Sequence, residues 1–108
     1  MVHPVTINNC KVTPKWFPAN DSDSVAWTVT DANAYSIDFN NKTPLTPPLT
    51  LIPTITSHQP VSKTVSGDSS CQKGIPISTG DCYFEYRVYQ YQGVNKTLCG
   101  DPGIHMVN

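Results

Sequence analysis

Soft metal ligands gather near the end of the chain, where Cys99, His105 and Met106 follow one another closely. A thiolate, an imidazole and a weak axial thioether are ligands of a blue-copper electron-transfer centre, which also needs a second histidine. His105 and Met106, however, are neighbours on an expected strand, so their side chains should point to opposite faces of the sheet. Cys99 is also a candidate half of a disulfide. We therefore expect no metal site from these residues.

The other residues that could do chemistry are scattered. His3 and His58 could in principle join His105 at a zinc ion, but their wide spacing is typical of surface histidines. Nucleophilic catalysis needs a Ser or Cys beside a base that a third group holds, and no such order of residues occurs. The loop from Asp21 to Ser24 lacks the Gly and the distal Glu of a calcium-binding loop. We expect neither an enzyme nor a bound cofactor.

The chain contains four cysteines, an even number in a small sequence with few lysines. This usage is typical of an oxidising compartment and predicts two disulfides. We favour Cys71 with Cys82, which would staple a loop, and Cys10 with Cys99, which would join the first strand region to the segment before the last strand. Four cysteines allow three connectivities, and the sequence does not select among them.

Three tripeptides fit the acceptor pattern for N-glycosylation, at Asn20, Asn41 and Asn95. Pro44 directly follows the second tripeptide and makes it a poorer acceptor. With the cysteines, these sites indicate an extracellular, cell-surface or periplasmic location. The first residues lack the basic start and apolar core of a secretory leader, so the chain would be a mature form without it.

Length and composition limit the remaining classes of function. The 108 residues have room for a single domain, covering 1–108. The net charge is −1, only 14% of residues are charged and no run of Lys or Arg occurs, so we expect no nucleic-acid partner. No apolar stretch approaches the roughly 20 residues of a membrane span, so we expect no membrane insertion.

A long strand dominates the expected fold. From Cys82 to Gln92 the residues alternate with period two and are rich in aromatics, which predicts a half-buried β-strand. We assign Phe84, Tyr86 and Val88 to its core face, and Glu85, Arg87, Gln90 and Gln92 to its wetter face. A turn at Gln92–Asn95 should follow, and a last strand should cover Ile104–Val107.

Further short strands are expected along the chain, and ten prolines argue against helices. The region from Thr43 to Pro60 should be mostly a crossover, because proline removes the backbone donors that strand pairing needs. Seven or eight strands with frequent turns predict an all-β sandwich of two sheets. The other expected strands are Val5–Val12, an edge or crossover piece at Trp16–Phe17, Val25–Val29, Tyr35–Phe39, Leu49–Ile52 and Val61–Val65.

The order of these pieces resembles the small cupredoxin-like domains of exported bacterial proteins. The matching motifs are Val25-Ala-Trp27, Tyr35-Ser-Ile-Asp-Phe39, Phe84-Glu-Tyr-Arg-Val88 and Asp101-Pro-Gly-Ile104, and they span residues 10 to 107. The resemblance implies a two-sheet Greek-key β-sandwich. It also places the first copper histidine near Tyr35 or Ser36 and the copper cysteine at Val88, and none of these residues is a copper ligand.

We therefore expect a non-catalytic exported module that serves surface architecture, adhesion or self-assembly. Its partner would be a glycan or a protein, including a second copy of the chain. Four aromatic residues of the wetter faces could form the binding surface, although for any one of them covering the sheet or packing under a loop is the favoured role: Trp16, Tyr83, Tyr89 and Tyr91. The alternative is a copper-binding electron-transfer cupredoxin, which Tyr35, Ser36 and Val88 disfavour.

Overall fold

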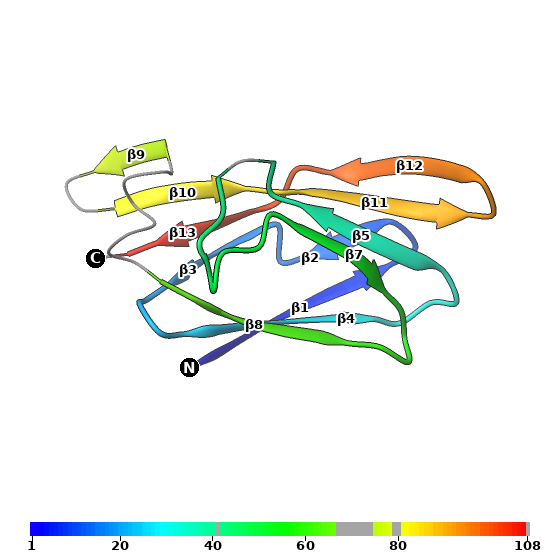
Figure 1. Ribbon diagram of the computed structural model, residues 1–108, viewed down its shortest axis with the longest axis horizontal. Coiled ribbons are helices and arrows are strands. Elements are labelled where there is room, and N and C mark those ends of the chain that lie inside the picture. Colours follow the sequence, from blue (N-terminus) through cyan, green and yellow to red (C-terminus); the bar gives the residue numbers. More distant parts are fainter. Residues whose placement is uncertain (41, 67–74, 79–80, 108) are drawn as a thin grey trace.

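A computed structural model describes residues 1–40, 42–66, 75–78 and 81–107. These residues form thirteen strand segments and no helix, as the composition predicts. They are arranged as one five-stranded sheet and two four-stranded sheets, which lie in two layers (Figure 1). The all-β class is confirmed. The segments outnumber the seven or eight expected strands, because bulges and prolines divide longer strands into separately paired pieces.

The five-stranded sheet has the order β2-β1-β4-β8-β6. Its central pair, β1 and β4, is parallel, and the other pairs are antiparallel. Strands β4 and β8 confirm two of the expected strands. The members of this sheet are β1 (Val2–Asn8), β2 (Lys11–Thr13), β4 (Ser24–Val29), β6 (Leu45–Thr46) and β8 (Val61–Val65).

The second layer consists of two four-stranded sheets that share one long hairpin. One sheet has the order β3-β13-β10-β9 and the other β12-β11-β5-β7. The members of the first are β3 (Trp16–Ala19), β13 (Gly103–Met106), β10 (Asp81–Glu85) and β9 (Ile75–Ser78). Those of the second are β12 (Asn95–Gly100), β11 (Arg87–Gln92), β5 (Ala34–Asp38) and β7 (Leu51–Ile55).

The expected long strand is present as β10 followed directly by β11, and its partner is β12 followed by β13. The Tyr86 N–H donates to the Pro102 carbonyl over 2.9 Å, so the ladder continues between the two sheets. Val88 pairs with Gly100 but Tyr89 pairs with Leu98, which leaves Cys99 as the extra residue of a β-bulge. The hairpin turns at Gly93, whose φ is 63°.

Two expectations about individual strands are wrong. The segment Val5–Val12 is not one strand, because Asn9 and Cys10 both have positive φ angles (48° and 65°) and turn β1 back into β2. In the proline-rich region, β7 begins at Leu51 and reaches Ile55, further than expected. Strand β7 lies at a sheet edge, where Pro53 need not donate to a neighbour.

An aromatic cluster fills the space between the layers. Trp27 of β4 contacts Phe39 and Tyr86, with ring centroids 6.4 and 5.9 Å away. The indole N–H of Trp27 donates to the Tyr86 hydroxyl over 3.3 Å, which gives each buried polar atom a partner. Burial raises the pKa of Tyr86 to about 12, so the hydroxyl remains protonated.

Gln90 corrects the expected faces of the long strand. It was assigned to the wetter face, but it shares the parity of Phe84, Tyr86 and Val88 and is buried with them. Its side-chain amide donates to the Tyr35 hydroxyl over 3.1 Å. Polarity alone misplaced it, because strand geometry puts every second residue on the same face regardless of its chemistry.

The disulfide between Cys10 and Cys99 is present and joins the β1–β2 turn to the bulge of β12. It therefore connects the five-stranded sheet to one of the four-stranded sheets. Cys71 and the side chain of Cys82 lie outside the described residues, so that expected pair stays a prediction.

We expect replacement of both Cys10 and Cys99 by serine to lower the free energy of unfolding by about 4–5 kcal/mol. The bond closes a loop with a sequence separation of 89, and the stabilisation grows with the logarithm of loop length. Urea unfolding followed by tryptophan fluorescence measures the difference. A change below about 1 kcal/mol would show that the bond contributes little to stability.

Candidate functional site

The three soft ligands near the end of the chain do not converge. Cys99 is bonded to Cys10 and has no free thiolate. Met106 is completely buried, whereas His105 lies on the outer face beside Trp16, with ring centroids 6.1 Å apart. Among the described residues, no group of three or more His, Cys, Asp or Glu side chains is arranged to hold a metal ion.

The positions that the cupredoxin resemblance singles out lie on β5 and β11. Val88 is buried and pairs with Ile37, so its side chain belongs to the hydrophobic core. Tyr35 pairs with Gln90, and its side chain is buried with the core. Ser36 follows on the opposite face, where its hydroxyl lies 3.1 Å from the hydroxyl of Tyr91.

Tyr35 is the centre of a polar network. Its hydroxyl donates to Asp31 over 2.7 Å and accepts from the Cys10 N–H over 3.0 Å and from Gln90 over 3.1 Å. Asp31 also accepts the N–H groups of Asn9 and Asn33, each over 2.7 Å. The network therefore ties the β1–β2 turn, which carries Cys10, to both central strands of the other layer.

Electrostatics keep this network in one protonation state. Burial opposes ionisation of Asp31, but the hydrogen bonds from Tyr35 and from the backbone of Asn33 and Asn9 outweigh it and lower the pKa of the carboxyl group. Burial and the Asp31 carboxylate raise the pKa of Tyr35. At neutral pH the carboxylate therefore accepts and the phenol donates.

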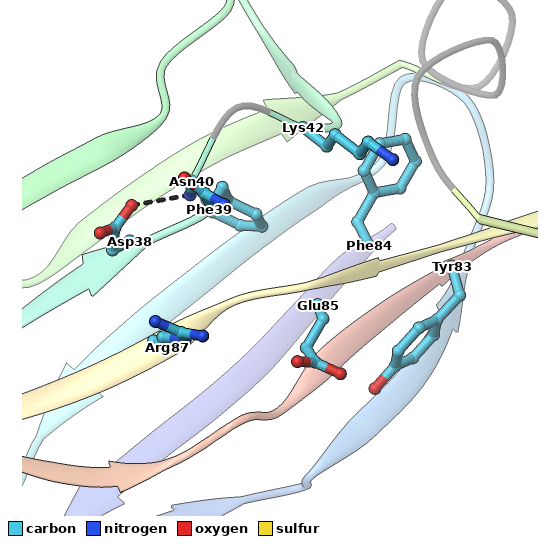
Figure 2. A pocket seen from close by; sticks show the side chains of 8 residues that line it. All are labelled: Asp38, Phe39, Asn40, Lys42, Tyr83, Phe84, Glu85 and Arg87. Atoms are coloured by element: carbon cyan, nitrogen blue, oxygen red, sulfur yellow. Dashed lines mark hydrogen bonds between the residues drawn. The ribbon is translucent and has the colours of Figure 1, made fainter.

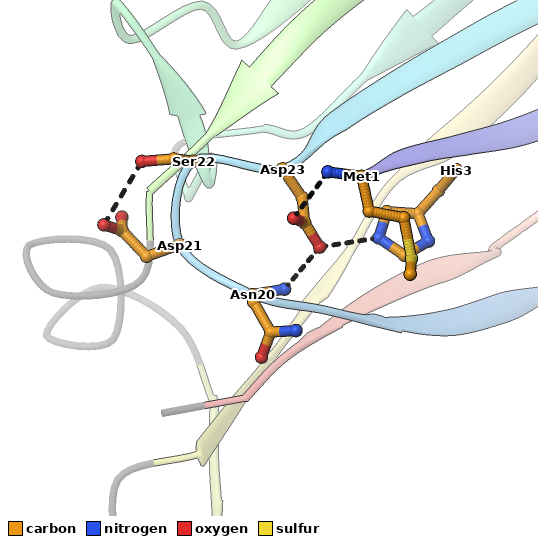
Figure 3. Close-up of polar contacts among 6 residues, drawn as sticks. All are labelled: Met1, His3, Asn20, Asp21, Ser22 and Asp23. Atoms are coloured by element: carbon orange, nitrogen blue, oxygen red, sulfur yellow. Dashed lines mark hydrogen bonds and ion pairs between the residues drawn. The ribbon is translucent and has the colours of Figure 1, made fainter.

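The loop from Asp21 to Ser24 also serves the fold. Asp23 is buried and turned toward β1, as Figure 3 shows. Its carboxylate accepts from the Asn20 N–H over 2.9 Å and lies 2.8 Å from Nε2 of His3 and 3.3 Å from the Met1 ammonium. The bond from Asn20, followed by that from His3, lowers the pKa of Asp23 to about 2.

Asp23→Asn should remove an acid-sensitive part of the stability. The folded pKa is about 2 and the ordinary value is 3.8. The contribution is therefore complete above about pH 4 and is lost as the pH falls from about 4 to about 2. We expect the variant to lose about 1–3 kcal/mol at pH 7 and to show a flatter stability profile between pH 4 and 2.

Chemical denaturation at closely spaced pH values measures this profile. Asp21→Asn is the matched control, because it removes the same charge from an exposed residue of the same loop. Equal profiles for Asp23→Asn and the unaltered chain would contradict the assignment.

Aromatic side chains cover one end of the outer face of the second layer. Trp16 of β3 is 57% exposed and lies beside His105 of β13. Tyr83 pairs with His105, and its ring lies over Gly103, where a Cβ atom would come within 2.1 Å of it. Trp16 also pairs with Gly103, so Trp16 and the Tyr83 ring adjoin the same bare glycine. We call Trp16, Tyr83 and His105 the aromatic patch.

Gly103 lies within β13, and its backbone angle does not explain why a glycine stands there. Among the described glycines, Gly93 and Gly100 are those with positive φ. The lack of a side chain at Gly103 is what the Tyr83 ring requires.

Gly103→Ala should destabilise the chain by about 1–3 kcal/mol, because the new methyl group displaces the Tyr83 ring. In a Tyr83→Ala background the same change should cost much less. A double-mutant cycle of unfolding free energies measures this coupling. Tyr89→Ala is the control, and its effect should add to that of Gly103→Ala, since the two residues lie far apart on the sheet. Additivity with Tyr83→Ala would contradict the packing.

The other two expected binding residues do not join the aromatic patch. Tyr89 and Tyr91 lie on β11, and six residues of extended chain, about 20 Å, separate Tyr83 from Tyr89. The ammonium of Lys96 lies 4.2 Å from the centre of the Tyr89 ring. Tyr91 contacts Ser36 through its hydroxyl. The four aromatics therefore form two separate groups.

A groove of about 310 Å³ adjoins the aromatic patch. It lies between the end of β5 and the junction of β10 with β11 (Figure 2). Glu85 and Tyr83 project from β10 on the side opposite to Phe84. Burial, with the carboxylates of Glu85 and Asp101, raises the pKa of Tyr83, so its phenol remains a donor. The groove is lined by Asp38, Phe39, Asn40, Lys42, Tyr83, Phe84, Glu85 and Arg87.

The sequence did not predict the groove. Glu85 and Arg87 were visible as a charged pair on one strand face, but Asp38 and Lys42 come from a distant segment. Only the pairing of Arg87 with Asp38 brings the two segments together. The sequence signal for the groove was the pair of charged residues, Glu85 and Arg87, at alternate positions of one strand.

Two of the candidate glycosylation sites can be placed. Asn20 is exposed at the end of β3, and Asn95 is exposed at the start of β12. Asn41 lies outside the described residues. Within the described part of the chain, no helix is present that could cross a membrane.

Comparison with known proteins gives no further assignment. No model of a protein family matches the chain, and no curated protein matches its sequence.

Proposed function

We propose that the chain is a non-catalytic exported binding module with a cupredoxin-like Greek-key sandwich fold, and that the aromatic patch binds carbohydrate. The observation that carries the proposal is the exposure of Trp16, at 57%, on the outer strand face beside a charged groove. A large exposed aromatic ring next to convergent polar groups is typical of a ligand site.

The chemistry of this surface suits a sugar. The apolar face of a pyranose ring can stack on the Trp16 indole, and its hydroxyls need both donors and acceptors nearby. Glu85 and Asp38 supply acceptors, and Arg87 and Lys42 supply donors. Tyr83 connects the two parts, because its ring belongs to the aromatic patch and its side chain lines the groove.

The buried network supports a binding module over a copper carrier. Tyr35 stands near the expected first histidine, and its hydroxyl already has three hydrogen-bond partners. Val88 supplies only hydrocarbon, and Cys99 is oxidised. The motifs that suggest the family, around Trp27, Phe39 and Tyr86, meet in the aromatic cluster between the layers, which supports the cupredoxin-like fold.

Export is supported by the disulfide and by the two exposed sequons at Asn20 and Asn95. Disulfides persist in oxidising compartments. The module would therefore meet carbohydrate outside the cytoplasm, at a cell surface or in a periplasm.

A glycan array, followed by titration calorimetry with the retained sugar, tests the proposal. Trp16→Ala should weaken binding at least about tenfold, whereas Trp16→Phe should keep most of the affinity. Leu51→Ala is the matched control, because it removes an exposed apolar side chain from the edge strand β7 of the other four-stranded sheet. Retention of no glycan, or equal affinity for Trp16→Ala and the unaltered chain, would exclude carbohydrate binding at this patch.

A further inference from the structure

Proline guards most of the sheet edges. An edge strand exposes unpaired N–H and C=O groups that can pair with another chain, and proline or a very short strand prevents this. In the described part of the chain, every edge strand except β12 contains or adjoins a proline. The guards are Pro18 in β3, Pro53 in β7, Pro76 in β9, Pro14 after β2, and Pro44 and Pro47 on either side of the two-residue strand β6.

Strand β12 is long and its outer edge is open. The two-residue turn at Gly93 and Val94 makes Gln92 and Asn95 a hydrogen-bonded pair. The N–H and C=O groups of Asn95 and Thr97 therefore point to β11. Those of Lys96 and Leu98 point away from β11, to the open edge of the sheet. At its other end, the strand is closed by the bulge at Cys99 and the disulfide.

The lysine of this strand does not guard the edge. A charged side chain, especially lysine, commonly protects an edge strand from pairing. The Lys96 ammonium instead lies over the ring of Tyr89, 4.2 Å from its centre, and so leans back across the sheet. Two exposed apolar side chains lie on this hairpin, Leu98 at 49% and Val94 fully exposed.

We propose that β12 pairs antiparallel with β12 of a second copy of this chain. With Thr97 at the two-fold axis, Lys96 of each copy lies opposite Leu98 of the other. Lys96 and Leu98 of both copies, whose backbone groups point to the open edge, then form two hydrogen-bonded pairs. Lys96 of one copy and Leu98 of the other then share a face of the joined sheet, and Thr97 meets Thr97.

Charge favours this register. A pairing centred on Lys96 would put two ammonium groups opposite each other, which is destabilising, whereas the register centred on Thr97 avoids this. The net charge of −1 also gives two copies little reason to repel each other. The same strand serves both copies, so the interface is isologous. Since the other described edges are guarded, the assembly closes as a dimer and does not grow into a filament.

Sedimentation velocity across about 1–500 µM, on unglycosylated protein, tests the proposal, and a concentration-dependent dimer is the expected result. Lys96→Pro removes an outward N–H without touching the pairing with β11, and should weaken dimerisation at least about tenfold. Lys96→Thr is the matched control, because it keeps that N–H and should still dimerise. Near-ultraviolet circular dichroism checks that each variant keeps the fold.

A charge series tests the register independently. Leu98→Lys places ammonium groups opposite Lys96 of the other copy and should weaken the dimer, whereas Leu98→Glu should strengthen it at low salt. If Leu98 instead faced Leu98, both variants would weaken it. A chain that stays monomeric at all concentrations, a dimer unaffected by Lys96→Pro, or species larger than a dimer would overturn the proposal.

This inference is independent of carbohydrate binding. The aromatic patch lies at the other end of the outer face, so Trp16→Ala should leave dimerisation unchanged and Lys96→Pro should leave the affinity of a single patch unchanged. Failure of one proposal is therefore distinguishable from failure of the other.

Discussion

The structure depends on the register of one hairpin, Asp81 to Met106, which passes through both four-stranded sheets. A single unpaired residue, Cys99, shifts that register, and a shift by one residue exchanges the two faces of a strand. Before the bulge, the side chains of Lys96 and Leu98 lie on the outer face of the sheet with those of Tyr91 and Tyr89. After it, Gly103 and His105 lie on that face with Glu85 and Tyr83. The bulge therefore decides that Ile104 and Met106 fill the core and that the aromatic patch has a bare glycine beneath it.

The same bulge also connects the two layers. It brings Cys99 to the turn at Asn9 and Cys10, where two consecutive residues adopt left-handed backbone angles that cost energy in residues other than glycine. The disulfide and the hydrogen bonds from Tyr35 and Asp31 to this turn hold it in place. Hydrogen-bonded side chains thus occupy this region and help to fix the architecture of the fold. The aromatic patch lies elsewhere, on the outer face of the second layer.

Periodicity predicted what depends on local pattern. The strand at Val25–Val29, the long strand and its turn follow from alternation and from glycine, and they are present close to the expected bounds. Features that depend on pairing were not predictable. Gln90 was misplaced because its polarity suggested solvent, although its partner Tyr35 comes from a distant strand. The groove needs Asp38 beside Arg87, and the bulge depends on which residue faces Val88. A single sequence contains no record of such cross-strand partners.

The distribution of proline gives the two proposals a common geometry. Proline at an edge prevents another strand from pairing there, whether that strand extends the sheet or belongs to a partner. Among the described edges, the one without proline is therefore the edge at which a partner strand can pair. A two-fold axis at Thr97 runs perpendicular to the sheet, because residues opposite each other on antiparallel strands share a face. The outer faces of both copies would then point the same way, with one aromatic patch at each far end. Two weak sites held on one side of a rigid assembly bind a repeating surface with an avidity that neither site has alone. An exported module with shallow carbohydrate sites would therefore gain affinity from the edge it leaves open.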